Sequence, residues 1–282
     1  MRVVITDGNF PAFEREIAAA RAAGASIELH QSRTAQEVAA AVAGADVAVV
    51  QFAPFHEEAV RALAPGATVI RYGVGYDNIN IAAARQLGVK VAYIPDYCTD
   101  EVADHTAAML LAMLRCLHTG DRTIRDHVWS VAAACPNLKP FPETVIGFLG
   151  LGRIGTGVLE RLRPFGFRFI AFDPARDASA GNDTNVEFVD RSALFRRADA
   201  LSLHAPSNPE TRHIINAAAI AAMQKTAVIV NTARGDLIDT KALAAALTEG
   251  RLGGAALDVF ETEPLPDNDP LRAAPNLILT PH

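Results

Sequence analysis

Gly150-Leu151-Gly152-Arg153-Ile154-Gly155 is the stretch that decides the fold of this chain. It follows an apolar, β-branched run at 144–149, and it opens a helical pattern of apolar residues at 158–162. A glycine turn between a strand and a helix lets the backbone approach a pyrophosphate, which the free N–H groups of the helix N-terminus bind. Such a motif is weak evidence when it stands alone. The strand before it and the helix after it together predict a dinucleotide-binding βα unit.

The residue that follows the next expected strand indicates which dinucleotide binds. Asp173 lies 18 residues after Gly155, at the end of the run 167–172. An acid in this place binds the adenosine ribose hydroxyls, and its charge would repel the 2′-phosphate of NADP. NAD is therefore the expected cofactor, although Arg176 leaves NADP open.

Apolar runs alternate with helical patterns along the chain, which predicts the α/β class with parallel sheets. The expected strands cover 2–6, 26–29, 46–51, 68–71 and 89–92, and then 144–149, 167–172, 200–204, 226–231, 255–259 and 277–280. An apolar helix at 100–118 separates the two series. We expect two Rossmann-like or flavodoxin-like domains with a cleft between them: a substrate domain at 1–98 and an NAD-binding domain at 99–282.

Three chemically active side chains each follow one of the last expected strands. They are Arg234, Glu263 and His282, and the apolar runs before them end at 230, 259 and 280. Ligands of open α/β sheets bind at the carboxyl ends of strands. An arginine there can hold a carboxylate through two parallel hydrogen bonds, and a histidine oriented by a carboxylate can act as acid and base. Each residue alone would more often be a surface charge or a structural histidine. The set predicts a site that binds an anionic substrate and moves a proton to or from its oxygen.

The composition is that of a metabolic enzyme. Half of the 282 residues are hydrophobic, and the formal charge of −6 gives no basic surface for nucleic acid or anionic membranes. The three cysteines have no metal-ligand spacing, so we expect no metal site, and we interpret their small, odd number as a sign of a reducing compartment. The chain begins with a strand-like run and no secretory signal, so the cytoplasm is expected.

Seven motifs carry a resemblance to a known family. They are GVGYDN (73–78), DEVADHT (100–106), GLGRIG (150–155), LHAP (203–206), NTARG (231–235), ALDVFETEP (256–264) and TPH (280–282). The chain resembles the D-isomer-specific 2-hydroxyacid dehydrogenases over nearly its whole length. Residues 95–101 resemble the branch that contains corepressors similar to the C-terminal-binding protein and assorted bacterial dehydrogenases.

The resemblance implies a role for each matching residue. Substrate carboxylate contacts fall on the Val74 and Gly75 amides and on Arg234, while His282 matches the acid/base and Glu263 its partner. The cofactor-binding positions are Gly150, Gly152, Arg153, Ile154, Gly155, Asp173, His204, Pro206, Thr232, Ala233 and Asp258. The implied activity is NAD-dependent interconversion of a D-2-hydroxy acid and its 2-keto acid.

The chain departs from the family at its end. Family members continue past the matching histidine and return a helix to the first domain, whereas this chain ends at His282. We therefore expect that the natural polypeptide is longer and that the 282-residue form, lacking that helix, has little or no dehydrogenase activity.

The loop at 51–56 resembles the one that faces the substrate side chain in the family. Its lack of lysine or arginine favours a small or apolar 2-keto acid over a phosphorylated one, although Arg71 and His56 could still reach the pocket.

We expect a homodimer built on the second domain, with the apolar helix at 101–118 as a candidate contact. A corepressor-like protein that senses NAD(H), with vestigial catalysis, is the alternative. A phosphite- or formate-oxidising enzyme is a less favoured one.

Overall fold

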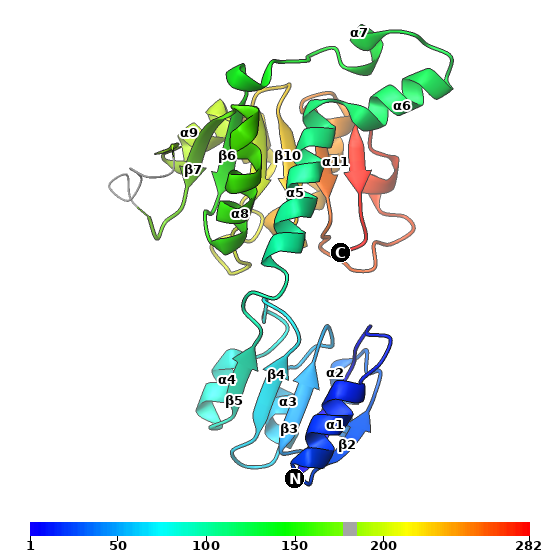
Figure 1. The fold of residues 1–282 in the computed structure, drawn as a ribbon, viewed down its shortest axis with the longest axis vertical. Coiled ribbons are helices and arrows are strands. Elements are labelled where there is room, and N and C mark those ends of the chain that lie inside the picture. The colour runs from blue at the N-terminus through cyan, green and yellow to red at the C-terminus, as the bar shows by residue number, and fades with distance from the viewer. Residues whose placement is uncertain (177–184) are drawn as a thin grey trace. The chain divides into compact units, whose positions relative to one another are not determined.

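The computed structural model describes residues 1–176 and 185–282. These residues divide into two compact units, Met1–Cys98 and Thr99–His282 (Figure 1). Each unit contains one sheet in which all the strand pairs are parallel. The predicted α/β class with two parallel sheets is therefore confirmed.

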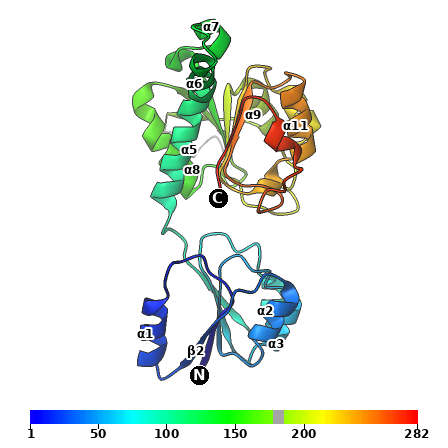
Figure 2. The ribbon, with the colours of Figure 1, turned by 90° about the vertical axis from the view of Figure 1, so that its right-hand side faces the viewer.

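The first unit is a five-stranded sheet of order β2-β1-β3-β4-β5, which is the flavodoxin-like order. Its elements are β1 (Arg2–Ile5), α1 (Glu14–Ala22), β2 (Ser26–Leu29), α2 (Ala35–Ala41), β3 (Val47–Val50), α3 (Glu57–Ala62), β4 (Thr68–Arg71), α4 (Ile81–Gln86) and β5 (Lys90–Tyr93). Helix α1 lies on one face of the sheet, and α2 and α3 lie on the other (Figure 2). The strand order reverses between β1 and β3, so the switch point of this sheet lies between them.

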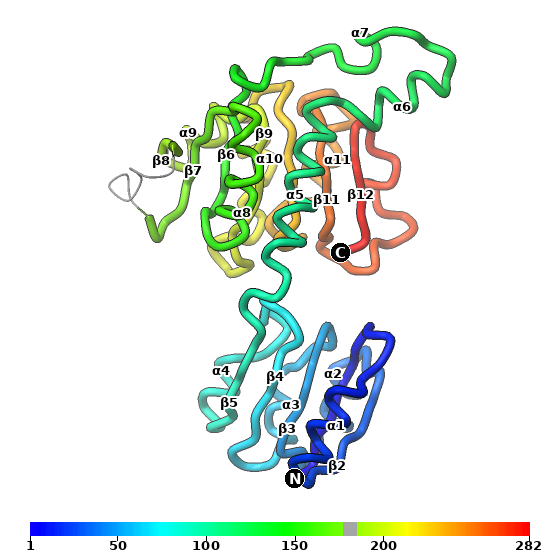
Figure 3. The backbone as a smooth tube through the Cα atoms, viewed as in Figure 1, coloured from blue at the N-terminus to red at the C-terminus, as the bar shows by residue number. Residues whose placement is uncertain are grey.

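The second unit is a seven-stranded sheet of order β12-β11-β10-β9-β6-β7-β8, with β8 at one edge and β12 at the other (Figure 3). Its strands are β6 (Val145–Leu149), β7 (Arg168–Phe172), β8 (Val186–Phe188), β9 (Ala200–Leu203), β10 (Val228–Asn231), β11 (Gly254–Leu257) and β12 (Leu277–Leu279). The six consecutive strands β6–β11 have the dinucleotide-binding order, which reverses between β6 and β9. Strand β8 was not predicted, because three residues are too few to show a periodicity.

Helices cover both faces of the second sheet. They are α5 (Thr99–Leu114), α8 (Arg153–Leu162), α9 (Arg191–Arg197), α10 (Ala217–Ala222) and α11 (Thr240–Thr248), with short helical turns at η1 (Phe141–Glu143), η2 (Arg163–Phe165), η4 (Gly235–Leu237) and η5 (Pro270–Ala273). Helices α5 and α8 pack over one core, and α9, α10 and α11 pack over the other. The apolar side of α5, including Ala103, Leu110 and Met113, is buried in its own core. The sheet therefore accounts for the apolar character that made this helix a candidate dimer contact.

The expected helix at 100–118 is shorter in the structure. It ends at Leu114, and Cys116 adopts a left-handed conformation (φ 52°) that interrupts the helix before α6 (Leu117–Arg125) begins. Helices α6 and α7 (Val131–Ala134) form an arm that extends beyond the sheet of the second unit (Figure 1). Trp129 is 92% exposed on this arm, and Leu117 and Val131 are also largely exposed.

A disulfide between Cys116 and Cys135 closes the base of the arm. Only Cys98 is a free cysteine among the described residues. The cysteines therefore do not support the inference of a reducing compartment, because two of the three are paired. Among the described residues, no helix is long and apolar enough to cross a bilayer.

Candidate active site

The glycine turn lies at the switch point of the second sheet, directly after β6. Gly150 has φ +89°, and a Cβ there would lie 3.0 Å from the backbone of His204. A Cβ on Gly155 would lie 2.9 Å from the carbonyl oxygen of Gly150, whereas a Cβ on Gly152 would meet no atom within 4 Å. Gly150 and Gly155 are thus required by packing inside the turn. Gly152 borders open space, where a ligand can approach the backbone.

The space beside Gly152 adjoins the N-terminus of α8. Gly152 is the N-cap of this helix and gives it no side-chain cap. The N-terminus of a helix favours an anion, because its N–H groups and the helix dipole both point toward it. Arg153 and Ile154 begin the helix, and Ile154 also packs against the core below it. This arrangement fits the pyrophosphate of a dinucleotide.

Asp173 lies at the end of β7, next to the glycine turn. Its two oxygens accept hydrogen bonds from the amides of Leu151 and Ala175, each 2.9 Å long. These bonds fix the carboxylate beside the turn. Because a carboxylate has about four acceptor sites, Asp173 can still accept bonds from ribose hydroxyls.

His204 has a structural position under the turn. Its amide donates to the carbonyl of Leu149 (2.8 Å), its Nε2 contacts Ser202 Oγ (2.8 Å), and its ring stacks on Phe148. Burial lowers the pKa of His204 to about 4, so the ring is neutral at physiological pH. Its ring packs against Gly155. We predicted that His204 lies along the cofactor, whereas its contacts show that its ring supports the glycine turn from below. Pro206, two residues later, is exposed.

Arg234 is held by the turn that follows β10. The buried Asn231 donates from Nδ2 to the carbonyl of Arg234 (2.8 Å), and its Oδ1 accepts from the amide of Ala233 (3.0 Å). Gly235 is required here, because a Cβ would lie 1.9 Å from the carbonyl carbon of Phe260. Asn231 and Gly235 thus fix the backbone that carries the half-buried guanidinium.

Thr232 ties the same turn to α5. Its hydroxyl is 2.7 Å from that of Thr106, and the bond is buried. The hydroxyl of Thr106 also donates to the carbonyl of Val102. The two threonines connect β10 to the helix that lies across the sheet.

His282 and Glu263 form a hydrogen-bonded pair. His282 Nδ1 is 2.7 Å from Glu263 Oε2, while Glu263 Oε1 accepts from the amide of Phe260 (2.9 Å). Burial opposes ionisation of Glu263, but the bonds from His282 and Phe260 and the charge of Arg234 outweigh it, so the pKa of Glu263 is lowered. Glu261, two residues before Glu263, has other partners: it accepts from His213 and from the amide of Thr240.

Asp258 holds the segment that carries His282. Its carbonyl accepts from the amide of His282 (3.0 Å), and its Oδ1 accepts from the hydroxyl of Thr280 (2.5 Å). His105, on α5, lies 3.1 Å from Thr280 Oγ1 and 3.4 Å from Asp258 Oδ1. His105 was missed as a site residue. Its presence in the DEVADHT motif was the one available signal.

The first unit places Val74 and Gly75 in the loop after β4. Gly73, directly before them, has φ +143°, and a Cβ there would collide with the guanidinium of Arg71. Arg71 donates to the carbonyl of Tyr72. The turn into the Val74–Gly75 segment therefore requires glycine.

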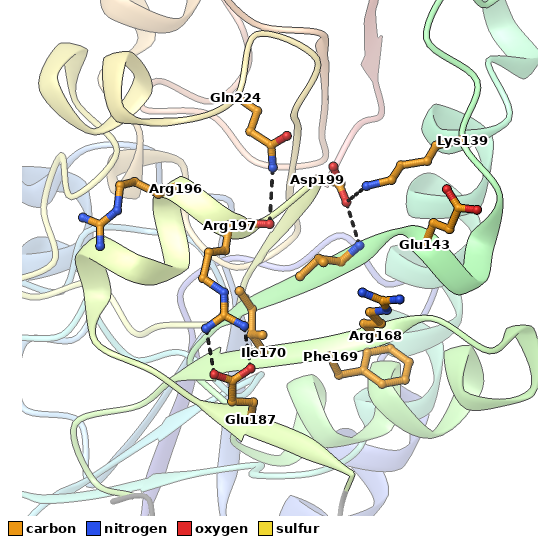
Figure 4. A pocket seen from close by; sticks show the side chains of 11 residues that line it. Lys139, Glu143, Arg168, Phe169, Ile170, Glu187, Arg196, Arg197, Asp199 and Gln224 are labelled. Carbon is orange, nitrogen blue, oxygen red and sulfur yellow. Dashed lines mark hydrogen bonds and ion pairs between the residues drawn. The ribbon is translucent and has the colours of Figure 1, made fainter.

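A cavity of about 570 Å³ lies at the opposite edge of the second sheet (Figure 4). Its charged side chains largely bind one another: Arg197 makes two bonds to Glu187, and Lys139 binds Asp199, which also accepts from the amide of Val145. Val145 begins β6 and Asp199 directly precedes β9, so this part of the lining lies at the amino ends of the strands, whereas ligands of such sheets bind at the carboxyl ends. The charged side chains of the cavity are paired with one another, and we assign no ligand to it. Among the described residues, no group of three or more His, Cys, Asp or Glu could hold a metal ion.

The fold and the site define a class: a doubly wound α/β protein with a dinucleotide turn and an arginine, a glutamate and a histidine at its strand ends. The family model for the NAD-binding domain of the D-isomer specific 2-hydroxyacid dehydrogenases matches residues 107–282. The chain belongs to this family, and NAD is the cofactor of the matched domain.

Three similar proteins illustrate the relationship. The chain is 39% identical to a glyoxylate reductase of Korarchaeum cryptofilum over 216 residues, which are 76% of this chain and 65% of the relative. It is 38% identical over its whole length to a D-3-phosphoglycerate dehydrogenase of Methanocaldococcus jannaschii, of which it covers 53%. A crystal structure of D-lactate dehydrogenase from Aquifex aeolicus, with NAD and lactic acid, matches with a TM-score of 0.85 and 26% identity, over 99% of this chain and 88% of that one. The chain thus spans between half and two thirds of the curated relatives named here.

Proposed function

We propose that this protein is an NAD-dependent oxidoreductase that interconverts a D-2-hydroxy acid and its 2-keto acid. The hydrogen bond of 2.7 Å between His282 and Glu263 carries the proposal, because it orients an imidazole at a strand end next to the charge of Arg234. That arrangement suits proton transfer to the oxygen of an anionic substrate.

The substrate would be bound through its carboxylate. In this proposal the amides of Val74 and Gly75 and the guanidinium of Arg234 donate to it, so the first unit serves as the substrate domain and the second as the NAD-binding domain. A guanidinium presents two parallel donors to a carboxylate, which fixes the orientation of the substrate as well as its position. Arg234 would also stabilise negative charge on the 2-oxygen during reduction.

The chain's own residues would provide proton transfer and orientation. Bound NADH supplies the hydride for the 2-carbon of the keto acid. His282 then gives its proton to the 2-oxygen, while Glu263, bonded to Nδ1, stabilises the imidazolium and holds the ring in place. Asp258 would bind the carboxamide of the nicotinamide, since only one of its carboxylate oxygens is bonded to Thr280.

The remaining cofactor contacts would come from the glycine turn and the strand ends around it. Gly150, Gly152, Arg153, Ile154 and Gly155 would hold the pyrophosphate, and Asp173 the adenosine ribose. The backbone at His204 and Pro206, and at Thr232 and Ala233, would line the path of the cofactor. The open space at Gly152 and the uncapped helix N-terminus support this assignment.

The relatives named above are reductases and dehydrogenases, which favours catalysis over an NAD-sensing binding role. The test is NADH oxidation against a panel of 2-keto acids, followed by analysis of the stereochemistry of the product. A D-2-hydroxy acid is expected. The assay uses the longest available polypeptide that contains residues 1–282, since little or no activity is expected of the 282-residue form. Production of the L-isomer, or no oxidation of NADH by that longer polypeptide with any member of the panel, would refute the proposal.

We further propose that the protein is a cytoplasmic homodimer. The exposed apolar side chains of the α6–α7 arm support self-association, because water-exposed apolar groups of this size are costly. Dependence on NAD supports the cytoplasm, and the Cys116–Cys135 disulfide is the observation against it. Mass measurement of the alkylated native protein would decide the state of these cysteines.

A further inference from the structure

The loop after β11, which carries Glu263, is tied to other parts of the second unit by Glu261. Glu261 Oε1 accepts from Nε2 of His213 (2.5 Å), and its Oε2 accepts from the amide of Thr240 (3.1 Å) at the start of α11. Burial opposes ionisation of Glu261, but the bonds from Thr240 and His213 outweigh it, so the pKa of Glu261 is lowered. At neutral pH, Glu261 therefore accepts both bonds as a carboxylate.

His213 belongs to the segment after β9, and this segment is itself bonded to the turn after β10. The amide of His213 donates to the carbonyl of Asp236 (2.8 Å), and Ser207 Oγ donates to Asp236 Oδ2 (2.6 Å). Two residues further on, Ile215 forms an isolated parallel bridge with Ile238. The backbone that carries the imidazole is therefore fixed before Glu261 is bonded to it.

The loop after β11 also lies directly against the turn after β10. Gly235 has no room for a Cβ beside the carbonyl of Phe260. The guanidinium of Arg212 lies 3.9 Å from Asp236 Oδ2 and 3.9 Å from Glu261 Oε1. The segments that follow β9, β10 and β11 are thus joined by contacts within the second unit, and none of these contacts has a part in the proposed proton transfer.

We propose that His213 and Glu261 are positioning residues, which hold Glu263 against the imidazole of the proposed acid/base. The bond from the amide of Phe260 to Glu263 lies within the loop after β11, so it cannot fix that loop to the sheet. Both bonds of Glu261 reach outside the loop, and they act two residues from Glu263. The inference rests on the proposed function, and it names the groups that keep His282 paired with its carboxylate.

The first test measures the pKa of His282 by NMR titration of its ring, without ligand, in the longest available polypeptide that contains residues 1–282. His213→Asn suits the left-handed backbone at this position (φ 49°), but its amide is too short to reach Glu261. It should lower the pKa of His282 by about 0.5 or more, in the same direction as Glu263→Gln, because a carboxylate that leaves the ring no longer favours the imidazolium form. His213→Gln, which can place a donor near the position of Nε2, should restore most of the parent value.

The pair of variants separates reach from charge. Asn and Gln are both neutral amides, so any effect of losing the charge of His213 is the same in both. His30→Asn is the control in the first unit, where His30 Nε2 lies 3.5 Å from Glu28, and it should leave the pKa of His282 unchanged. The other charged or titratable groups around the segment of His282 are kept in every variant: Arg234, Asp258 and His105.

The second test measures turnover of the best keto acid by the same variants. His213→Asn should lower kcat by about tenfold with a smaller change in KM, since a small misplacement of a reacting group is costly, and His213→Gln should recover most of the loss. A lowered His282 pKa in His213→Asn, restored in His213→Gln, would support the inference even if no polypeptide oxidised NADH, and that result would refute the proposed function alone. Oxidation of NADH by the parent, with an unchanged His282 pKa in His213→Asn, would refute this inference alone. A lower melting temperature with an unchanged His282 pKa would show a merely structural role and would also overturn it.

Discussion

Glu263 uses both of its carboxylate oxygens, one for the ring of His282 and one for the amide of Phe260. Burial alone would raise its pKa, and these bonds together with Arg234 lower it below the ordinary 4.5. A carboxylate with a lowered pKa contributes stability that is complete above the ordinary pKa and is lost as the pH falls through the lowered one. Glu263 is therefore ionised at neutral pH, where it accepts the hydrogen bond from His282.

We expect Glu263→Gln to shift the pH dependence of keto-acid reduction to lower pH. The glutamine keeps a hydrogen bond but removes the negative charge that favours the imidazolium form. The measurement is kcat/KM across pH 5 to 9, a range chosen to bracket the ordinary histidine pKa of about 6.5. A profile identical to that of the parent would show that the pairing has no catalytic role.

Substitutions of Arg234 and of His282 should change different kinetic constants. Arg234→Ala should raise KM and lower kcat, since the guanidinium contacts the carboxylate in both the ground state and the transition state. His282→Ala should lower kcat by about 10²- to 10⁴-fold with a smaller change in KM, because proton transfer is lost. Steady-state kinetics on the best keto acid separates the two. The roles assigned here would be wrong if both variants changed KM alone.

Asp173 should make NAD(H) bind about tenfold or more tightly than NADP(H), because its charge faces the 2′-position of the adenosine ribose. Titration of protein fluorescence with each reduced cofactor measures the preference. Asp173→Asn keeps one of the two oxygens that accept from the amides and removes the negative charge. It should therefore reduce the difference in affinity between NAD(H) and NADP(H). Equal affinities in the parent would indicate that Arg176 compensates for the acid.

At the scale of elements, the glycine turn separates a packing role from a binding role. Gly155→Ala should lower the melting temperature, because its Cβ would lie 2.9 Å from the carbonyl oxygen of Gly150. Gly152→Ala should leave the melting temperature nearly unchanged, since its φ of −77° suits alanine and its Cβ meets no atom. The same Cβ would occupy the proposed pyrophosphate space, so NAD affinity should fall.

The measurements for this turn are thermal unfolding without ligand and calorimetric titration with NADH. Gly120→Ala, in the exposed helix α6, is the control, and it should gain up to about 1 kcal/mol of helix stability without any effect on NADH binding. Unchanged NADH affinity in Gly152→Ala would place the pyrophosphate elsewhere.

At the scale of the whole molecule, we expect a dimer that depends on the α6–α7 arm. Trp129→Glu replaces the most exposed apolar side chain of the arm with a charged one. It should shift the molecular mass in solution toward that of the monomer, 30.0 kDa. Light scattering at micromolar concentration measures the mass. Leu87→Glu, in the first unit, is the control and should leave it unchanged. A parent protein that is already monomeric would exclude the dimer.

The sequence by itself determined most of the strands and the family of this protein. Periodic apolar runs gave all five strands of the first sheet and six of the seven in the second, with bounds within two residues. It gave the glycine turn and its strand-helix context, because a turn motif is a local property of adjacent residues. It also supplied Arg234, Glu263 and His282 as a set, since each follows a strand whose end could be located from the sequence.

The tertiary structure alone decided which of these groups touch. It paired His282 with Glu263 and Glu261 with His213, brought His105 to Thr280 across 175 residues, and stacked the ring of His204 on Phe148 under the turn. It also joined Cys116 to Cys135 and put Asp7 under the amides of the loop after β3. The physical reason is that the hydrophobic periodicity of a segment shows only which side of that segment is buried. A hydrogen bond between distant residues depends on strand order and loop geometry, which appear only when the sheet is assembled.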